Sequence, residues 1–352
     1  SGFDQPRGSY EAEIGRPGSM VVFADVDNDG DLDAYTGVDT REPITVADPD
    51  LGDVAVRETS ELMINDGRGN FAPADRGNAL RREGEEDITI SAAFVDVDRD
   101  GHLDLWLGQG GVGAPRQNRL YRNRGDGEFD EATAPAGLET LPWEGATTID
   151  DLNEARGHTM TWGVAACDLN DDAVPDLLSS SYGRAANHLW QGGADGRFTN
   201  RSLESGYARD DDYTWQDNEF AKCFCQGTPN APGCDEVGQP RVNCGQPNWN
   251  HDSGREAFRL GGNSGTTSCA DFDGDGRLDL FTSEIKHWWA GAGSDGSDVL
   301  LNRTGDDGLI TFERQPRDQI GMVIEQQSVA WDEGHISNGI IDVDNDGRPD
   351  IY

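Results

Sequence analysis

The sequence predicts an all-β fold of four-stranded units repeated in series, which is the pattern of a β-propeller. A nine-residue acidic loop of the type D-x-D-x-D-G-x-x-D occurs five times, once in altered form. The loops begin at Asp25, Asp96, Asp168, Asp271 and Asp342, so three of the four steps between them are 71 or 72 residues long. A second hairpin signal follows each of the first four loops. We therefore expect one domain over 1–352.

Two strands are expected around each loop, because the flanking segments are short, apolar and bordered by glycine. The segments before the loops are 20–24, 92–95, 164–167, 266–270 and 340–341. The segments after them are 32–35, 103–107, 177–178, 278–281 and 351–352. No segment with a helical period of useful length is predicted.

Two further strands per unit are expected around glycine-rich turns, which favour hairpins between apolar residues. These second hairpins span 62–71, 120–129, 189–198 and 300–312. The units then lie near 18–85, 86–157, 158–204, 263–330 and 331–352. The fifth unit is too short for four strands, so we expect a longer protein or completion of that unit by another chain.

Calcium is the metal that the loops predict. Positions 1, 3, 5 and 9 offer side-chain oxygens and position 7 a backbone carbonyl, and Ca²⁺ takes about six to eight such ligands. Glycine at position 6 permits the turn with positive φ. Solvated acidic turns are the alternative, but they do not account for the recurring glycine and ninth aspartate. Up to five Ca²⁺ ions are predicted, with these ligands: Asp25, Asp27, Asp29, Asp31, Asp33; Asp96, Asp98, Asp100, His102, Asp104; Asp168, Asn170, Asp172, Val174, Asp176; Asp271, Asp273, Asp275, Arg277, Asp279; Asp342, Asp344, Asp346, Arg348, Asp350.

The third loop departs from the pattern. Asn170 replaces an aspartate at position 3, and Ala173 replaces the glycine at position 6. A non-glycine residue with positive φ costs about 1 kcal/mol. We expect this loop to bind calcium most weakly. An EF-hand is not predicted, because none of the loops that extend that far has glutamate at position 12.

The charge of the chain restricts its partners. A formal net charge of −39, from 67 acidic and 28 basic residues, argues against nucleic acid and anionic membranes. No stretch approaches the roughly 20 apolar residues of a membrane span. The expected partner is a protein or glycan ligand at the cell surface or in the extracellular matrix, without membrane insertion, and self-assembly is a further option.

An insertion over 205–262 is expected between the third and fourth units, where the step between loops is longest. Its composition cannot build a core, so cross-links are needed. We predict that Cys223 and Cys225 each bond one of Cys234 and Cys244, in either order, and a four-thiolate zinc site is the alternative. Disulfides and calcium loops together indicate a secreted, cell-surface or periplasmic protein.

Cys167 and Cys269 precede equivalent loops, but at positions that differ by one residue. In regular strands this difference points their side chains to opposite faces. Their strands could be neighbours, but this offset argues against a bond between the two cysteines.

Catalytic residues are not predicted, because the histidines are scattered and no triad or carboxylate pair stands out beyond the loops. The densest candidate for other chemistry is the segment 284–289, Glu-Ile-Lys-His-Trp-Trp. It reads either as a sugar-stacking platform with an acid nearby or as a rim loop whose aromatic residues pack on a neighbouring unit.

The acidic loops and the turn at 123–129 resemble the FG-GAP/VCBS repeats of integrin α-subunits and many bacterial secreted proteins. The similarity is closest to the branch with cartilage acidic protein and ASPIC/UnbV relatives. The resemblance implies a seven-bladed propeller with calcium at the blade rims and a role in adhesion or recognition. We expect a secreted or cell-surface binding, adhesion or assembly module whose calcium is structural. The alternatives are a polysaccharide lyase or hydrolase and a subunit of an extracellular polymer.

Overall fold

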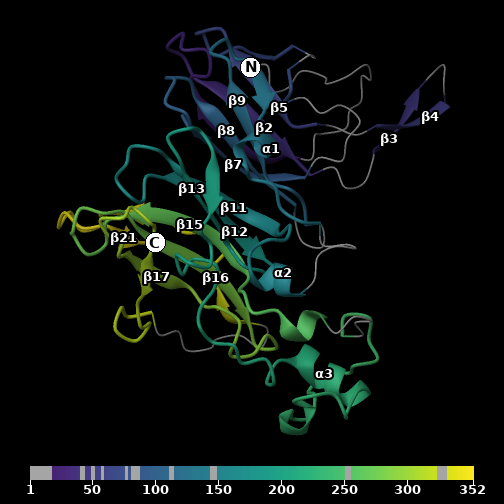
Figure 1. Cartoon of the computed structure of the whole chain (residues 1–352). Coiled ribbons are helices and arrows are strands. Elements are labelled where there is room, and N and C mark those ends of the chain that lie inside the picture. Colours follow the sequence, from purple (N-terminus) through teal and green to yellow (C-terminus); the bar gives the residue numbers. More distant parts are fainter. Residues whose placement is uncertain are drawn as a thin grey trace.

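The computed structural model describes residues 18–39, 44–48, 52–56, 59–75, 78–80, 88–110, 115–142, 149–249, 255–322 and 331–352. Residues 1–17 of the predicted domain lie outside this set. Over the described residues the chain is all-β, with antiparallel sheets that follow one another through the molecule in sequence order (Figure 1).

Each of the first four sheets begins with the two strands that flank an acidic loop, which confirms the prediction. The first strands are β1 (Gly18–Ala24), β7 (Thr89–Val95), β11 (Met160–Cys167) and β15 (Ser264–Ala270). The return strands are β2 (Asp33–Val38), β8 (Asp104–Gln109), β12 (Asp176–Tyr182) and β16 (Asp279–His287). The ninth residue of every loop is thus the first residue of a return strand.

The second hairpins complete these sheets, again as predicted. Their strand pairs are β5 (Glu61–Asn65) and β6 (Phe71–Pro73), β9 (Arg119–Asn123) and β10 (Phe129–Glu131), β13 (His188–Gly192) and β14 (Phe198–Asn200), and β17 (Asp298–Asn302) and β18 (Phe312–Arg314). The strand orders are β1-β2-β5-β6, β7-β8-β9-β10, β11-β12-β13-β14 and β15-β16-β17-β18.

The remaining strands lie outside these four-stranded paths. The fifth acidic loop joins β20 (Ile340–Ile341) to β21 (Asp350–Ile351). Strand β19 (Trp331–Gly334) pairs with the end of β16 and widens the fourth sheet. Strands β3 (Ile44–Asp48) and β4 (Gly52–Val56) form a separate hairpin between β2 and β5.

The core lies between consecutive sheets, because alternate residues of a strand face opposite neighbours. In β8, Leu105 and Leu107 pack toward the first sheet, whereas Trp106 packs toward the third. In β12, Leu177 packs toward the second sheet and Leu178 toward the fourth. The first strands β1, β7, β11 and β15 lie beside one another in that order. Every inner sheet is therefore covered on both faces.

Short helices occur only in the connections of the described chain: α1 (Thr133–Ala136), α2 (Ile149–Asn153), α3 (Glu219–Gly227) and two 3-10 turns. Helix α3 was not predicted. Its first turn is capped by Asn218, whose side chain accepts a hydrogen bond from the Ala221 N–H at 2.7 Å. The sequence Asn218-Glu219 was the available signal. None of the helices described is both long and apolar enough to span a membrane.

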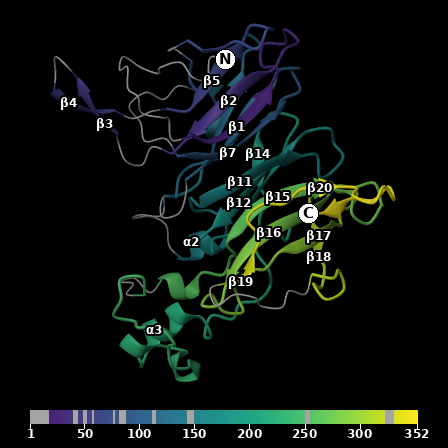
Figure 2. The same cartoon turned by 180° about the vertical axis from the view of Figure 1, so that it is seen from behind.

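The insertion projects from one end of the sheets as the lobe that carries α3 (Figure 2). Both ends of its predicted range belong to the scaffold. Tyr207 is buried in the core between the third and fourth sheets. Gly261 lies so close to Ala185 that an added Cβ would approach the Ala185 carbonyl oxygen to 2.3 Å. The part of the insertion that lies outside the sheets is therefore about 209–258.

The disulfides within the insertion match the prediction and resolve its open choice. Cys223 bonds Cys244, and Cys225 bonds Cys234, each with a Cα–Cα distance of 5.3 Å. With these four cysteines in disulfides, the zinc alternative is excluded in this structure. The two bonds tie the middle and the last turn of α3 to the segment that follows it.

The prediction for Cys167 and Cys269 is wrong, because the two form a third disulfide with a Cα–Cα distance of 6.7 Å. The prediction treated their strands as neighbours within one sheet, where opposite faces cannot meet. In the structure β11 and β15 belong to different sheets that pack face to face. The front of one sheet meets the back of the next, so side chains on opposite faces of equivalent strands come together.

Candidate metal centres

The five acidic loops share one hydrogen-bond framework. The carboxylate at position 1 accepts the N–H groups of positions 5 and 6, as at Asp96, where the distances are 3.1 and 2.9 Å. The carboxylate at position 5 accepts the N–H of position 7. The same bonds of position 1 recur at Asp25, Asp168, Asp271 and Asp342. These bonds fold each loop into a turn with its acidic side chains on one side.

Two positions of each loop have left-handed backbone conformations. Position 6 was predicted to do so, and φ there is 90° at Gly101 and 65° at Ala173. Position 4 also has positive φ, which the sequence did not indicate. The residues there are Asn28, Arg99, Asp171, Gly274 and Asn345. Asparagine, aspartate and glycine tolerate this conformation best, so the position carries a weak signal that could have been read.

The ninth aspartate connects the loop to the rest of its sheet. Asp104 is 1% exposed, and its Oδ2 accepts the Val97 N–H at 3.0 Å while its Oδ1 accepts the Asn123 N–H at 2.8 Å. Asp33, Asp176 and Asp279 are equally buried and make the same two kinds of bond. In the fifth loop, Asp350 accepts the Val343 N–H. The ninth aspartate is thus foremost a structural anchor.

The electrostatics of the ninth aspartate follow from this burial. Loss of solvation raises the pKa of Asp104 to about 6 and that of Asp176 to about 7. The pKa values of Asp33 and Asp279 are also raised by burial, and the two backbone N–H donors act in the opposite direction. A cation in the loop would favour the charged form of these carboxyl groups.

Three carboxylates converge in four of the five loops, with oxygens within 4.8 Å of one another. The groups are Asp25, Asp27 and Asp29; Asp96, Asp98 and Asp104; Asp271, Asp273 and Asp279; and Asp342, Asp344 and Asp350. Hard oxygen ligands in that arrangement bind Ca²⁺, a hard cation, better than they bind softer metals. The third loop, all of which is described, brings no such group together, in keeping with Asn170 at its third position.

Basic side chains neutralise part of the charge at the second and fourth loops, as Arg348 does at the fifth. Arg303 contacts Asp273 at 3.2 Å and Asp275 at 3.9 Å, and Arg277 bonds Asp275 within the loop. Arg122 lies 3.5 Å from Asp98. The first loop has a neighbour of another kind, because Asn28 contacts the ring of His102 in the second loop at 2.8 Å. The loops therefore lie together at one end of the sheets.

Position 7 supplies side chains of four different kinds. The side chain of Val174 is buried, whereas Arg277 turns to Asp275 and Arg348 lies 3.9 Å from Asp346. At Asp31, burial and the neighbouring loop carboxylates raise the pKa. This diversity agrees with a role for the backbone carbonyl, which every residue offers equally.

The segment 284–289 docks the insertion. The Trp289 carbonyl accepts the first N–H of α3, from Glu219, at 2.9 Å. The Trp289 ring meets Phe220 and Trp249 with centroids 5.2 and 5.8 Å apart, and Arg241 lies 4.4 Å from the Trp288 ring centroid. Trp288 and Trp289 thus pack on the insertion, whereas the second interpretation expected packing on a neighbouring unit.

A row of aromatic rings continues from this contact across the ends of the third and fourth sheets. His287 stacks on Trp289 at 4.6 Å, its Nε2 lies 3.4 Å from the Tyr182 hydroxyl, and Tyr182 meets Trp162 at 5.4 Å. All of these rings are partly exposed. We call Trp162, Tyr182, His287, Trp289, Phe220 and Trp249 the aromatic row. It lies at the end of the sheets opposite the acidic loops, and only its 287–289 part was anticipated.

Glu284, the acid of the same segment, is buried beneath the row at 2% exposure. Its Oε1 accepts a bond from the Ser264 hydroxyl, and its Oε2 has no hydrogen-bond partner. Burial and the nearby Asp295 raise the pKa of Glu284, and burial with Asp210 nearby raises that of Asp295 to about 8. Three acidic oxygens do not converge here, so the group does not resemble the loops.

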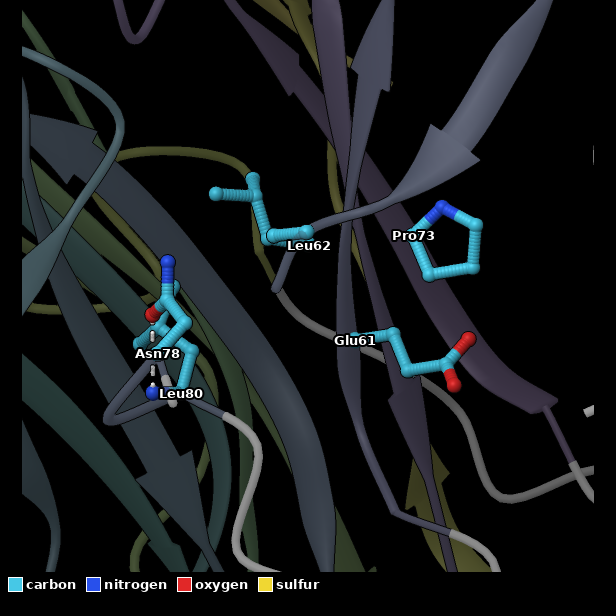
Figure 3. A pocket seen from close by; sticks show the side chains of 6 residues that line it. Glu61, Leu62, Pro73, Asn78 and Leu80 are labelled. Atoms are coloured by element: carbon cyan, nitrogen blue, oxygen red, sulfur yellow. Dashed lines mark hydrogen bonds between the residues drawn. The ribbon is translucent and has the colours of Figure 1, made fainter. Parts of the chain in front are cut away.

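The cavities of the described residues are small. One, beside β5, has a volume of about 10 Å³ and lies between Leu62, Pro73 and Leu80; Asn78 closes it by accepting the Leu80 N–H at 3.1 Å (Figure 3). That is room for about one water molecule. A wider cavity of about 240 Å³ lies in the insertion, beside the Cys225–Cys234 disulfide and Lys222.

No family model matches the sequence, and no curated protein matches it. Among solved structures, a lectin of Agrocybe aegerita described as recognising non-reducing terminal N-acetylglucosamine matches at 15% identity and a TM-score of 0.43, over 96% of this chain and 61% of that one. The exotype rhamnogalacturonan lyase YesX matches at 12% identity and a TM-score of 0.35, over 81% and 45%. The chain therefore spans less than two thirds of either protein. At these TM-scores the similarities establish no shared function.

Proposed function

We propose that the chain is a calcium-stabilised β-propeller module of the FG-GAP/VCBS type, which binds a protein or glycan ligand outside the cell. One observation carries the calcium part: the same hydrogen-bonded loop is built five times, and in four copies three carboxylates converge. Carboxylates so close together repel one another, and a divalent cation removes that cost.

In this proposal the calcium ions stabilise the fold and take no part in chemistry. The ninth aspartate already ties each loop to the return strand and, in four units, to the second hairpin as well. A bound ion would add the carboxylates at positions 1, 3 and 5 and the carbonyl at position 7 to the same anchor. The loops would then hold the first strands, which lie side by side, at a fixed spacing.

Three disulfides support a location outside the cell, because such bonds form and persist in oxidising compartments. Calcium at the millimolar level found there suits loops of modest affinity. The described chain has no free cysteine that would need a reducing environment.

The aromatic row is our candidate for the ligand surface. It joins the third sheet, the fourth sheet and the insertion, and two of its rings carry polar groups, the Tyr182 hydroxyl and the His287 imidazole. Aromatic faces with hydrogen-bonding groups at their edges suit a neutral glycan, because its C–H faces stack on rings and its hydroxyl groups find partners. The strongly negative chain would repel polyanionic sugars.

Thermal unfolding with and without calcium tests the first part. We expect EDTA to lower the Tm by 10 °C or more and excess Ca²⁺ to restore it, whereas Mg²⁺ at the same concentration restores little. An unchanged Tm after chelation would refute the proposal.

A glycan array of neutral, cationic and anionic oligosaccharides tests the second part. Trp162→Ala is expected to abolish binding of the neutral ligands with the calcium-dependent Tm intact. Tyr213→Ala is the matched control, because Tyr213 is an exposed aromatic residue outside the row. Equal loss of binding in both variants, or binding that survives Trp162→Ala, would contradict the assignment.

A further inference from the structure

One buried asparagine in each of two units joins two acidic loops. Asn123 ends β9, and its side-chain Nδ2 donates to the Val26 carbonyl of the first loop at 2.7 Å and to the Leu103 carbonyl of the second at 3.1 Å. Asn302 ends β17 and does the same for the third and fourth loops, with the Leu169 carbonyl at 2.7 Å and the Leu278 carbonyl at 2.9 Å.

Both amides have every hydrogen-bonding group occupied. The Oδ1 atom of Asn123 accepts the Gly125 N–H at 2.9 Å, and that of Asn302 accepts the Thr304 N–H at 2.9 Å. The side chains are 5% and 0% exposed. A buried amide with all its bonds made is held in one orientation, because losing any of them leaves an unsatisfied polar group.

The bonded carbonyls lie between predicted metal ligands. Val26 separates positions 1 and 3 of the first loop, and Leu103 separates positions 7 and 9 of the second. The backbone N–H of Asn123 also donates to Asp104, the ninth residue of the second loop, at 2.8 Å. One residue therefore contacts the ligand-bearing backbone of two loops at once.

The second and third loops lack this connection. The equivalent residue of the third unit is Gly192, whose N–H donates to Asp176 at 2.9 Å but which has no side chain. A Cβ there would lie 2.5 Å from the Pro175 carbonyl oxygen. Asn65 of the first unit reaches one loop only among the described residues, through the Leu32 carbonyl at 3.0 Å.

We propose that Asn123 and Asn302 are positioning residues that couple calcium binding in pairs, the first loop with the second and the third with the fourth, while the second and third bind independently. This inference rests on the proposed calcium binding. An ion that orders one loop fixes a carbonyl held by the shared amide, so the neighbouring loop loses less freedom when it binds its own ion.

The test disables loops one at a time by replacing the exposed carboxylate at position 5. Asp29→Ala, Asp100→Ala and Asp172→Ala act on the first, second and third loops. The affinity of each remaining site is measured by calorimetric titration, and the calcium-dependent rise in Tm is measured in parallel. We expect Asp29→Ala to lower the calcium affinity of the second loop about fivefold or more. Asp172→Ala should leave the calcium affinity of the second loop unchanged.

Asn123→Gly introduces into the second unit the residue that the third unit has naturally. In this background, we expect the effects of Asp29→Ala and Asp100→Ala on calcium binding to be additive. Asn65→Gly is the matched control, since it removes an amide that serves a single loop, and it should preserve the coupling. Because Asn28 also contacts the second loop, Asn28→Ala in the Asn123→Gly background measures any remaining coupling through that contact.

The outcomes separate the inference from the proposed function. If calcium binds to no variant and leaves the wild-type Tm unchanged, calcium binding itself is refuted. If calcium binds and stabilises the wild type but the first two loops behave additively there, the coupling is refuted and calcium binding stands. If the double variant Asn123→Gly with Asn28→Ala still shows coupling, Asn123 does not couple the two loops.

Discussion

The third unit and its neighbours reach the same loop geometry with different residues. The second and fourth units have aspartate at position 3, glycine at position 6 and an asparagine at the end of the third strand; the third unit has Asn170, Ala173 and Gly192 instead. Yet Asp168 accepts the same two N–H groups as its equivalents, and Asp176 makes the same two anchoring bonds. The hydrogen bonds therefore set the shape of the loop, and the third unit keeps that shape without a carboxylate at position 3.

Asp176→Ala tests this conclusion with the largest expected effect. It leaves the buried N–H groups of Leu169 and Gly192 without acceptors, which costs about 2–4 kcal/mol of unfolding free energy. Urea unfolding in EDTA, where no ion contributes to stability, measures the loss. The control Asp172→Ala removes an exposed carboxylate of the same loop and should cost less than about 1 kcal/mol. Similar losses in the two variants would mean that the charges hold the loop together.

Asp295→Asn extends the comparison to a buried carboxylate that accepts a single backbone N–H, from Asp210, and has other acids nearby. The folded-state pKa of Asp295, about 8, lies above its unfolded value of 3.8, so the folded chain keeps a proton that the unfolded chain releases. Stability should therefore fall as the pH rises from about 4 to about 8, by at most about 1.4 kcal/mol per pH unit. We expect unfolding at pH 5 and pH 8 in saturating calcium to show a smaller pH dependence of stability in Asp295→Asn than in the wild type. The variant should also be more stable than the wild type at pH 8.

The control for this prediction is Asp211→Asn, which changes an exposed aspartate of the same region. It should keep the pH dependence of the wild type. A wild-type slope retained in Asp295→Asn would place the responsible proton elsewhere.

Ala173→Gly has the smallest expected effect and acts on the third unit alone. Ala173 is exposed with φ of 65°, so glycine should add about 1 kcal/mol of stability by removing strain. Adding Asn170→Asp should then raise the calcium affinity of the third loop toward that of the second, as measured by calorimetric titration. The reverse change in the second loop, Gly101→Ala, should cost about the same amount.

Repetition made the scaffold predictable. Five copies of one loop located the strand pairs around it, and Asp-Gly turns located the second hairpins, because both signals are local in sequence. The ninth aspartate was predicted as a ligand, but its bond to the neighbouring strand of the sheet could not be inferred from the loop alone. The same holds for Asn123, whose partners Val26 and Leu103 are distant in sequence.

The errors arose where the relation between sheets mattered. Cys167 and Cys269 were judged as if their strands lay in one sheet, where side chains on opposite faces cannot meet. In two sheets that pack face to face, side chains on opposite faces of equivalent strands do meet. Helix α3 and two rings of the aromatic row, Phe220 and Trp249, belong to the insertion, where no repeat provides a second copy for comparison. Trp162 was not singled out because its neighbour Tyr182 comes from the other strand of the hairpin, and the row forms only when the two sheet ends and the insertion meet.

The Cys167–Cys269 bond has a consequence for how the chain tolerates damage and change. The part of the insertion outside the sheets lies wholly between these two cysteines in the sequence. A protease that cut within about 209–258 would leave the two pieces covalently joined at the middle of the scaffold. For the same reason, a segment of different length could replace this part without releasing one sheet from the next. Because this bond joins the third and fourth sheets directly, the lobe could be exchanged while the two sheets stay linked.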